Sequence, residues 1–259
     1  MHDQDRRAAV RDFYADSAIL DQYRALNEIG LTPFEEALLA RVLTPGRRVL
    51  DVGCGAGREA CVLIGRGMRV VAVDIVPEMV QLTVREAASR ALPVAALVAD
   101  TQCLPFRDES FESAILVNQV IAHVPGRDGR VAALRDIHRT LKPGGVLAMT
   151  THNRRCPRYR AYFAWVNPWR RALRALGFAG VLDDDDRWSG RSGAIRVARR
   201  AYFHMYDLDE AVVDLTRAGF EITAAGGQTE FESGRSVPRA RERDYLLGFV
   251  ARKPVQPVK

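Results

Sequence analysis

The stretch from Val49 to Glu59 constrains the fold of this chain more than any other part of the sequence. Its residues are Val-Leu-Asp-Val-Gly-Cys-Gly-Ala-Gly-Arg-Glu, so an apolar run leads into a Gly-x-Gly-x-Gly loop and then into a helical pattern. Glycine permits a tight turn and lets a ligand approach the backbone closely. The free N–H groups at the start of the following helix favour an anionic group. The stretch therefore predicts a strand–turn–helix unit with a binding site at the turn.

Short apolar runs alternate with longer amphipathic runs through most of the chain. We expect strands over residues 48–52, 69–73, 94–99, 113–117, 146–150, 220–224 and 245–251. We expect helices over residues 58–66, 77–90, 130–141 and 207–218, with further helices before residue 45. Near-continuous apolar strands joined through helices are typical of a parallel sheet covered on both faces. The pattern predicts an α/β fold with a doubly wound, mostly parallel sheet.

The composition excludes several classes of protein. With 259 residues, 47% of them hydrophobic and 27% charged, the chain is neither collagen-like, nor disordered, nor a disulfide-rich miniprotein. No apolar run approaches the roughly 18–20 residues of a membrane-spanning helix, and no apolar signal core follows the charged N-terminus. The four cysteines form no CxxC pair and no Cys/His zinc pattern. We expect a cytoplasmic protein with reduced thiols, no metal and no membrane partner.

Positive charge is concentrated in one segment. Twelve arginines, no lysine and only the four acids Asp183–Asp186 lie between Arg154 and Arg200, so this segment carries a charge of +8 within a chain of net charge +6. Such a segment can attract an anionic partner. An arginine-rich surface without a partner is the alternative, and the sequence leaves both open.

Acidic residues follow two further predicted strands. Asp74 closes the second strand, 17 residues beyond Gly57, where a carboxylate can accept both hydroxyls of a ribose. Asp100 comes just after the third strand, where it can accept the exocyclic amine of adenine, and the N–H of Thr101 can donate to a ring nitrogen. The spacing indicates an adenosine-containing ligand. No GxxxxGK[ST] loop is present, which argues against nucleotide hydrolysis.

With these motifs in order, the sequence resembles the class I S-adenosylmethionine-dependent methyltransferases. The matching pieces are Leu50–Gly57, Val73-Asp74, Ala99-Asp100 with Leu104-Pro105-Phe106, and Arg139–Gly145. They cover residues 46–150 closely, and the resemblance extends loosely over residues 204–252. The family commonly has Asp where Glu112 stands. The resemblance implies a seven-stranded sheet whose last strand is antiparallel, and transfer of a sulfonium methyl group to a nucleophile.

The resemblance also implies a set of cofactor-binding residues. Asp51 would hold the methionyl amine, Asp74 the ribose diol and Asp100 the adenine amine. Ile75 would pack on adenine, and Asn118 would lie under the methionyl group. The full set expected to bind S-adenosylmethionine is Asp51, Gly53, Cys54, Gly55, Gly57, Asp74, Ile75, Asp100, Thr101 and Asn118.

Three histidines are candidates for an acceptor-side base, because histidine exchanges protons near neutral pH. His152 is the first choice, since it follows the fifth strand at the edge where open α/β sheets bind ligands. His204 could reach in from the arginine-rich segment. His123 follows the fourth strand and could instead be structural. An in-line displacement, which is the expected chemistry, needs a base only for some acceptors.

We divide the chain into four regions. We expect residues 1–45 to form a helical lid, 46–150 the cofactor-binding core, 151–203 an insertion that builds an acceptor pocket or lid, and 204–259 the rest of the sheet. Tyr14 and Tyr23 could close over the cofactor from the first region.

The expected function is methyl transfer to oxygen or nitrogen of a small organic acceptor. The alternative is a tRNA methyltransferase whose arginines follow phosphates while aromatic residues stack on a base. A nicotinamide-dependent dehydrogenase and a non-catalytic cofactor-binding protein are weaker alternatives. The GxGxG spacing and the Asp100 motif count against the dehydrogenase. The sequence does not indicate an oligomeric state.

Overall fold

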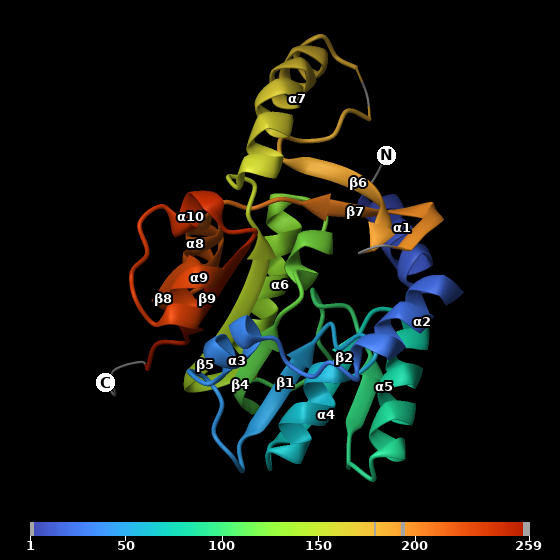
Figure 1. Cartoon of the computed structure of the whole chain (residues 1–259), viewed down its shortest axis with the longest axis vertical. Coiled ribbons are helices and arrows are strands. Elements are labelled where there is room, and N and C mark those ends of the chain that lie inside the picture. Colours follow the sequence, from blue (N-terminus) through green and yellow to red (C-terminus); the bar gives the residue numbers. More distant parts are fainter. Residues whose placement is uncertain (1–2, 179, 193–194, 256–259) are drawn as a thin grey trace.

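A seven-stranded sheet forms the centre of the computed structural model, which describes residues 3–178, 180–192 and 195–255 (Figure 1). Its strand order is β3-β2-β1-β4-β5-β9-β8. The strands are β1 Arg48–Val52, β2 Arg69–Asp74, β3 Ala95–Val98, β4 Phe111–Leu116, β5 Leu141–His152, β8 Glu221–Gly227 and β9 Leu246–Arg252. The first five run parallel, and β9 runs antiparallel to both β5 and β8. The predicted fold class and its antiparallel last strand are confirmed.

Helices cover both faces of the sheet because neighbouring residues of each strand point to opposite sides. In β1, Val49 belongs to an apolar cluster with α3 and α4, whereas Leu50 belongs to a cluster with α6 and α8. The helices that alternate with the strands along the chain are α4 Arg58–Gly65, α5 Pro77–Ser89, α6 Arg127–Thr140 and α8 Leu208–Arg217. Three short helical segments are η1 Val120–His123, α9 Gln228–Ser233 and α10 Ala240–Arg243. The core thus consists of two apolar layers, one on each side of the strands.

Three helices precede the sheet: α1 Asp3–Tyr14, α2 Ser17–Leu26 and α3 Pro33–Leu39. Helix α3 begins with a capping box, in which the Thr32 hydroxyl accepts the N–H of Glu35 at 3.3 Å and the Glu35 carboxylate accepts the N–H of Thr32 at 2.7 Å. Such reciprocal hydrogen bonds satisfy two of the free N–H groups at a helix start. The start of this helix is where the Thr-Pro-x-Glu pattern predicts it.

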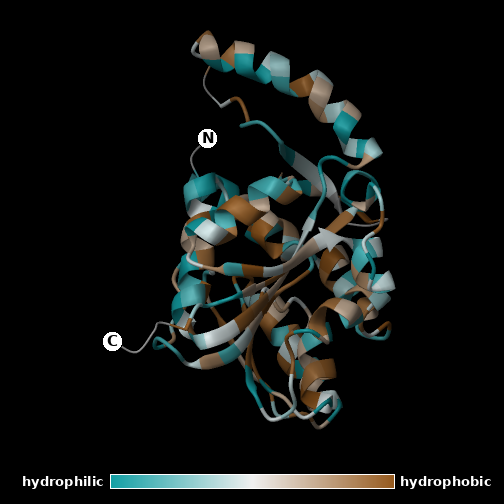
Figure 2. Ribbon diagram, turned by 90° about the vertical axis from the view of Figure 1, so that its left-hand side faces the viewer, coloured by the Kyte–Doolittle hydropathy of each residue, from teal (hydrophilic) through white to brown (hydrophobic). Residues whose placement is uncertain are grey.

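The segment before α8 contains more regular structure than its sequence pattern predicts. We expect a helix over residues 167–176 among loops, but helix α7 extends from Pro157 to Ala175 with Pro168 inside it. A hairpin of β6 Asp186–Ser192 and β7 Ile195–His204 follows. Helix α7 projects from the body of the molecule, with polar and apolar residues intermixed along it (Figure 2). None of the described helices combines the length and the apolar character that crossing a bilayer requires.

Strand β7 lies against the N-terminal helices, although the two are far apart in sequence. Val10 and Phe13 of α1 share an apolar cluster with Ala201 and Tyr202 of β7, and Met79 of α5 joins them. The N-terminal helices and the hairpin therefore form one packed unit above one edge of the sheet (Figure 1).

Candidate active site

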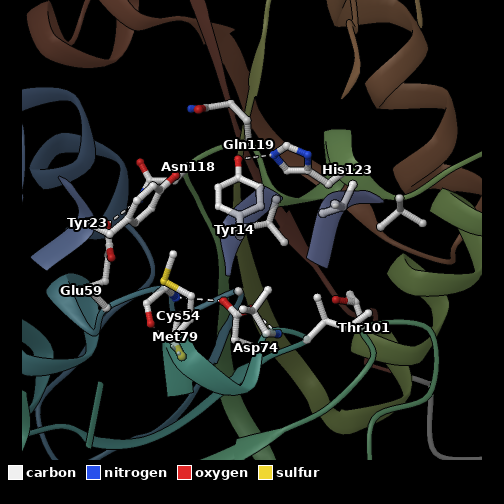
Figure 3. Close-up of a pocket in the computed structure, with 18 of the residues that line it drawn as sticks. Tyr14, Tyr23, Cys54, Glu59, Asp74, Met79, Thr101, Asn118, Gln119 and His123 are labelled. Carbon is white, nitrogen blue, oxygen red and sulfur yellow. Dashed lines mark hydrogen bonds between the residues drawn. The ribbon is translucent and has the colours of Figure 1, made fainter. Parts of the chain in front are cut away.

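A cavity lies at the carboxyl ends of β1, β2 and β4, beneath helices α1 and α2 (Figure 3). It encloses about 1210 Å³ of space, including its open mouth. Eight of the expected cofactor-binding residues line it: Gly53, Cys54, Gly55, Asp74, Ile75, Asp100, Thr101 and Asn118. Asp51 and Gly57 do not. Ligands of open α/β sheets bind outside the carboxyl ends of the strands, so this cavity has the expected location.

The glycine loop needs its glycines for steric reasons. Gly53 has a φ of +77°, and a Cβ there would lie 2.3 Å from Cγ2 of Val120. Gly57 has a φ of +89°, and a Cβ there would lie 3.0 Å from the Cα of Thr83. Side chains at these positions would push η1 or α5 away from the loop. Gly57 thus shapes the turn without lining the cavity.

The Asp74 carboxylate is held by backbone donors at the wall of the cavity. Its Oδ2 accepts the N–H of Gly55 at 3.0 Å, and its Oδ1 accepts the N–H of Val76 at 2.9 Å. Burial raises the pKa of this carboxyl above its ordinary value, and the backbone donors oppose that rise. Each oxygen keeps acceptor capacity for a ligand hydroxyl. The side chains of Ile75 and Met79 add apolar surface beside it.

The acid on β1 is not the acid that faces the cavity. Asp51 is 1% exposed, and its Oδ2 has no hydrogen-bond partner among the described residues. Burial raises its pKa well above the ordinary value, and the neighbouring charges of Glu59 and Asp74 add to that rise. Glu59, in the first turn of α4, does line the cavity, and it accepts an N–H of the Asn118 amide at 2.6 Å. Asp51 therefore lies behind the cavity wall that Glu59 forms.

Two residues of this wall are absent from our sequence-based set, namely Arg58 and Glu59. The Arg58 guanidinium contacts Glu59, donates to Glu35 at 2.5 Å and donates to the carbonyl of Gly30 at 2.8 Å. It thereby joins the glycine loop to the segment before α3. Arg58 and Glu59 both lie in the first helical turn after the glycine loop, and this position is a signal that could have identified them as site residues.

The chain bends sharply after β4. Asn118 and Gln119 both have positive φ angles, +53° and +62°, which are uncommon for residues with side chains. Two such residues in succession cost conformational energy and often mark functional sites. The bend turns the Asn118 amide toward Glu59 and carries η1, with His123 at its end, over the cavity (Figure 3).

Helix α1 reaches the part of the cavity where adenine is expected. Nη1 of Arg7 forms an ion pair with Oδ2 of Asp100 at 2.8 Å, and Oδ1 of Asp100 accepts the N–H of Gln102 at 2.9 Å. Both Arg7 and Thr101 line the cavity. Asp100, whose carboxylate is expected to accept a hydrogen bond from the adenine amine, therefore also binds α1 through Arg7.

Of the three histidine candidates, His123 lines the cavity. Its Nδ1 lies 2.9 Å from the carbonyl oxygen of Tyr202, so Nδ1 carries the hydrogen and donates it. Its Nε2 therefore has a free electron pair, which accepts the Tyr14 hydroxyl at 2.8 Å (Figure 3). Burial lowers the pKa of His123 to about 4. At neutral pH the ring is uncharged, in one tautomer, with Nε2 facing the cavity.

His152, our first choice from the sequence, is not among the residues that line the cavity. Its ring packs 4.7 Å from the ring of Tyr245 and 6.3 Å from that of Phe203, measured between centroids. Burial lowers its pKa to about 3. Phe203 contacts both histidine rings and lies closer to His123, with centroids 4.3 Å apart.

His204 lies outside the cavity in a buried charged cluster. Its Nδ1 is 2.8 Å from Oδ1 of Asp186, and its Nε2 is 2.9 Å from Oε1 of Glu210. Burial opposes charging of the imidazole, but the hydrogen bonds to the two carboxylates outweigh it and raise the pKa of His204 above 6.5. The structure thus gives His204 two carboxylate partners that join the hairpin to α8.

We expect this charged histidine to make stability depend on pH. Its folded-state pKa is raised, so its contribution is fully present below pH 6.5 and is lost as pH rises through the folded-state value. The wild-type free energy of unfolding should therefore fall more between pH 6 and pH 9 than that of the His204→Gln variant. Urea unfolding at both pH values measures the difference. Parallel changes in the two proteins would contradict the assignment.

Comparison with known proteins gives the site a family context. Residues 50–149 match the family model described as "Methyltransferase domain". A Xanthomonas campestris protein named ubiquinone biosynthesis O-methyltransferase is 33% identical over 130 residues, which are 50% of this chain and 52% of that protein. An uncharacterized Mycobacterium tuberculosis protein is 30% identical over 148 residues, 57% of this chain and 51% of that protein. The chain thus spans about half the length of these curated relatives.

Solved structures share the fold at low sequence identity. An S-adenosylmethionine-dependent methyltransferase from Methanosarcina mazei matches with a TM-score of 0.63 at 21% identity, over 88% of this chain and all of that one. The CcbJ methyltransferase from Streptomyces caelestis matches with a TM-score of 0.61 at 19% identity, over 86% of this chain and 89% of that one. The matched domain, residues 50–149, includes the glycine loop and the strand ends that line the cavity.

Proposed function

We propose that this chain, whose residues 50–149 match the methyltransferase domain, is a class I S-adenosylmethionine-dependent methyltransferase and that it methylates a hydroxyl oxygen of a small organic acceptor. The observation that carries the proposal is the position of His123. A neutral imidazole nitrogen faces the cofactor cavity and already accepts a hydrogen bond from a hydroxyl group.

The described residues fit the cofactor. The glycine loop presents backbone without side chains to the cavity at Gly53 and Gly55, and the fixed Asp74 carboxylate offers two oxygens to a ribose diol. Ile75 and Met79 offer apolar surface to the adenine. We assign the methionyl amine to Glu59, which faces the cavity, in place of the deeper Asp51. When bound, S-adenosylmethionine supplies a methyl group activated by its sulfonium charge.

His123 would orient the acceptor and remove its proton. Because Nδ1 donates to the Tyr202 carbonyl, Nε2 can accept only from the cavity side. The Tyr14 hydroxyl occupies that position, and an acceptor hydroxyl that replaces it would donate to the same nitrogen. The proton would pass to Nε2 as the oxygen gains its methyl group. Orientation and proton transfer are the contributions expected of a general base.

Three features favour oxygen over nitrogen as the methylated atom. The group now hydrogen-bonded to Nε2 is a phenolic hydroxyl, that of Tyr14. The acceptor side of the cavity is otherwise apolar near Val120, Val124 and Pro125. The Xanthomonas relatives are O-methyltransferases by name. An aromatic or allylic alcohol of small size would suit this surface.

We propose that residues 1–45 serve as a lid, joined by the end of the insertion. Arg7 and Tyr14 of α1 contact Asp100 and His123 on the core, so α1 spans the adenine end and the acceptor end of the cavity. Tyr202, on β7, supplies the carbonyl that sets the His123 tautomer. The lid and the insertion would therefore order the acceptor site together.

The tRNA alternative receives less support from the arginine-rich segment. Several of its arginines are already paired with acids of the chain: Arg154 with Asp185, Arg171 and Arg174 with Asp184. Tyr162, Trp165 and Trp169, which could stack on a base, do not line the cavity. We therefore propose the small acceptor.

Transfer of label tests the proposal. The full-length protein would be incubated with S-adenosylmethionine labelled in its methyl group, together with either a pool of small phenols and alcohols or bulk tRNA. We expect label in the small-molecule pool and base-stable ether products. Label in the tRNA alone, or in amines alone, would overturn the proposal.

The pH dependence of turnover gives a second check. His123 is active as a base only when neutral, and its pKa is lowered to about 4. We therefore expect kcat/KM to stay level from about pH 8 down to pH 5 and to fall as pH approaches 4, with circular dichroism confirming that the chain is folded at each pH. A midpoint near 6.5, the ordinary histidine value, would contradict a buried His123 as the base.

A further inference from the structure

Helix α7 exposes an apolar face to solvent. Tyr162 is 43% exposed, Trp165 71%, Trp169 64% and Leu176 73%. Leu173 is also exposed, and the five residues recur at intervals of three or four, which places them on one side of the helix. We call these five residues the aromatic face. Contiguous exposed apolar surface of this kind marks an interaction site, whereas single exposed apolar residues such as Val84 and Val213 do not.

The opposite side of α7 is tied to the protein, so the aromatic face cannot turn inward. The buried residues of the helix are Tyr159, Phe163 and Asn167. Arg170 donates to the carbonyl of Asp186 at 2.7 Å, and Arg174 donates to the Asp184 carboxylate at 2.6 Å. These contacts hold α7 as an arm that projects from the body of the molecule (Figure 2), and the aromatic face is exposed on it.

The charge of α7 determines what kind of surface it can approach. The helix contains five arginines and no acidic residue. Arg158 and Arg160 are exposed and form no ion pair within the described part of the chain. Arg158 precedes Tyr162 by four residues and Trp165 by seven, so it lies on the aromatic face at its N-terminal end. Arg158 therefore shares the outer surface with the aromatic side chains, whereas Arg160, two residues before Tyr162, lies on another side of the helix.

We propose that α7 docks this protein on an anionic lipid surface. Tryptophan and tyrosine favour the interface between lipid and water, where one part of the ring is in an apolar environment and another is hydrated. Exposed arginines add attraction to anionic headgroups. A helix with aromatic residues and the unpaired Arg158 on one side can lie in the plane of the interface without crossing the bilayer. Our sequence-based expectation of no membrane partner considers spanning segments, which this mode of binding does not require.

Sedimentation with lipid vesicles tests the proposal with the full chain. We expect the wild-type protein to co-sediment with vesicles that contain phosphatidylglycerol, to bind phosphatidylcholine vesicles at least tenfold more weakly, and to dissociate as salt is raised. The chain has three tryptophans, so the Trp188→Phe variant reports on Trp165 and Trp169 alone. Its fluorescence emission should shift to shorter wavelength on binding. Wild-type protein that stays in the supernatant with anionic vesicles would overturn the proposal.

Variants separate docking from folding and from cofactor binding. Trp165→Ser with Trp169→Ser should weaken vesicle binding at least tenfold and leave the affinity for S-adenosylmethionine unchanged. Val84→Ser with Val213→Ser is the matched control, because it removes exposed apolar side chains from α5 and α8 and should leave vesicle binding unchanged. Equal loss in both double variants would contradict the proposal. Light scattering tests a different partner. If the wild type does not bind vesicles but forms a dimer that only the tryptophan variant loses, the aromatic face binds a second copy of the chain, and the lipid proposal is wrong.

Discussion

Replacement of Asp74 by alanine is expected to weaken binding of S-adenosylmethionine about 100-fold or more. The carboxylate oxygens are fixed by the N–H groups of Gly55 and Val76 and face the cavity. Hydrogen bonds to a charged acceptor contribute about 1.5–3 kcal/mol each. Loss of the two bonds to the ribose diol therefore costs about 3 kcal/mol at least, a factor of about 100 in affinity. Titration calorimetry measures the change directly.

The fold should survive this substitution. Asp74 is half-buried, and burial raises the pKa of its carboxyl, so its removal relieves an unfavourable desolvation. Glu78→Ala is the matched control, because it removes an exposed carboxylate four residues further along, outside the cavity. Thermal unfolding should give similar midpoints for the two variants. Wild-type affinity in Asp74→Ala would refute the ribose assignment.

Replacement of His123 by glutamine is expected to lower kcat for the labelled acceptor about 100- to 10,000-fold, the usual range for loss of a general base. The affinity for S-adenosylmethionine should change little, because the ring faces the acceptor side of the cavity near Tyr14. Initial rates with the acceptor identified by label transfer, together with calorimetry, separate the two effects. A loss of cofactor affinity with unchanged kcat would show that His123 is structural.

Two further substitutions sharpen this test. Tyr14→Phe removes the hydroxyl that contacts Nε2 of His123, and we expect less than a tenfold change in kcat because the acceptor replaces that hydroxyl. His138→Gln is the control for replacing a histidine, since His138 packs on Phe220 away from the cavity. If His138→Gln lowered kcat as much as His123→Gln does, the loss of activity would not be specific to the proposed base.

The sequence was sufficient for the core of the fold because the relevant signals are local. An apolar run such as Val70–Val73 favours a strand between covered faces, and the glycine loop after Val52 can turn only where side chains are absent. Six of the seven predicted strands agree with those observed to within three residues, whereas β5 begins at Leu141, five residues before the predicted start. The sequence pattern did not predict the secondary structure of the insertion. Pro168 lies inside α7, so the pattern predicted only the second half of that helix, and the weak apolar–polar alternation of β6 and β7 did not predict the hairpin.

For the site, the sequence identified most of the lining but not which of several equivalent groups faces the cavity. Asp51 and Glu59 flank the same loop, and only the twist of β1 and the start of α4 decide that Glu59 faces inward. His123 and His152 both follow strands at the same edge of the sheet. The bend at Asn118 carries one over the cavity, while Tyr245 covers the other.

The sequence by itself determined the succession of the core strands and helices along the chain, the glycine turn and the acids that follow the strands. Each of these features depends on residues close together in the chain. The tertiary structure alone decided the acceptor side. There, Tyr14 of the first helix and the Tyr202 carbonyl of the hairpin meet on the two nitrogens of His123. Such a meeting depends on how separate elements pack against one another, and packing of distant segments leaves no periodic trace in the sequence.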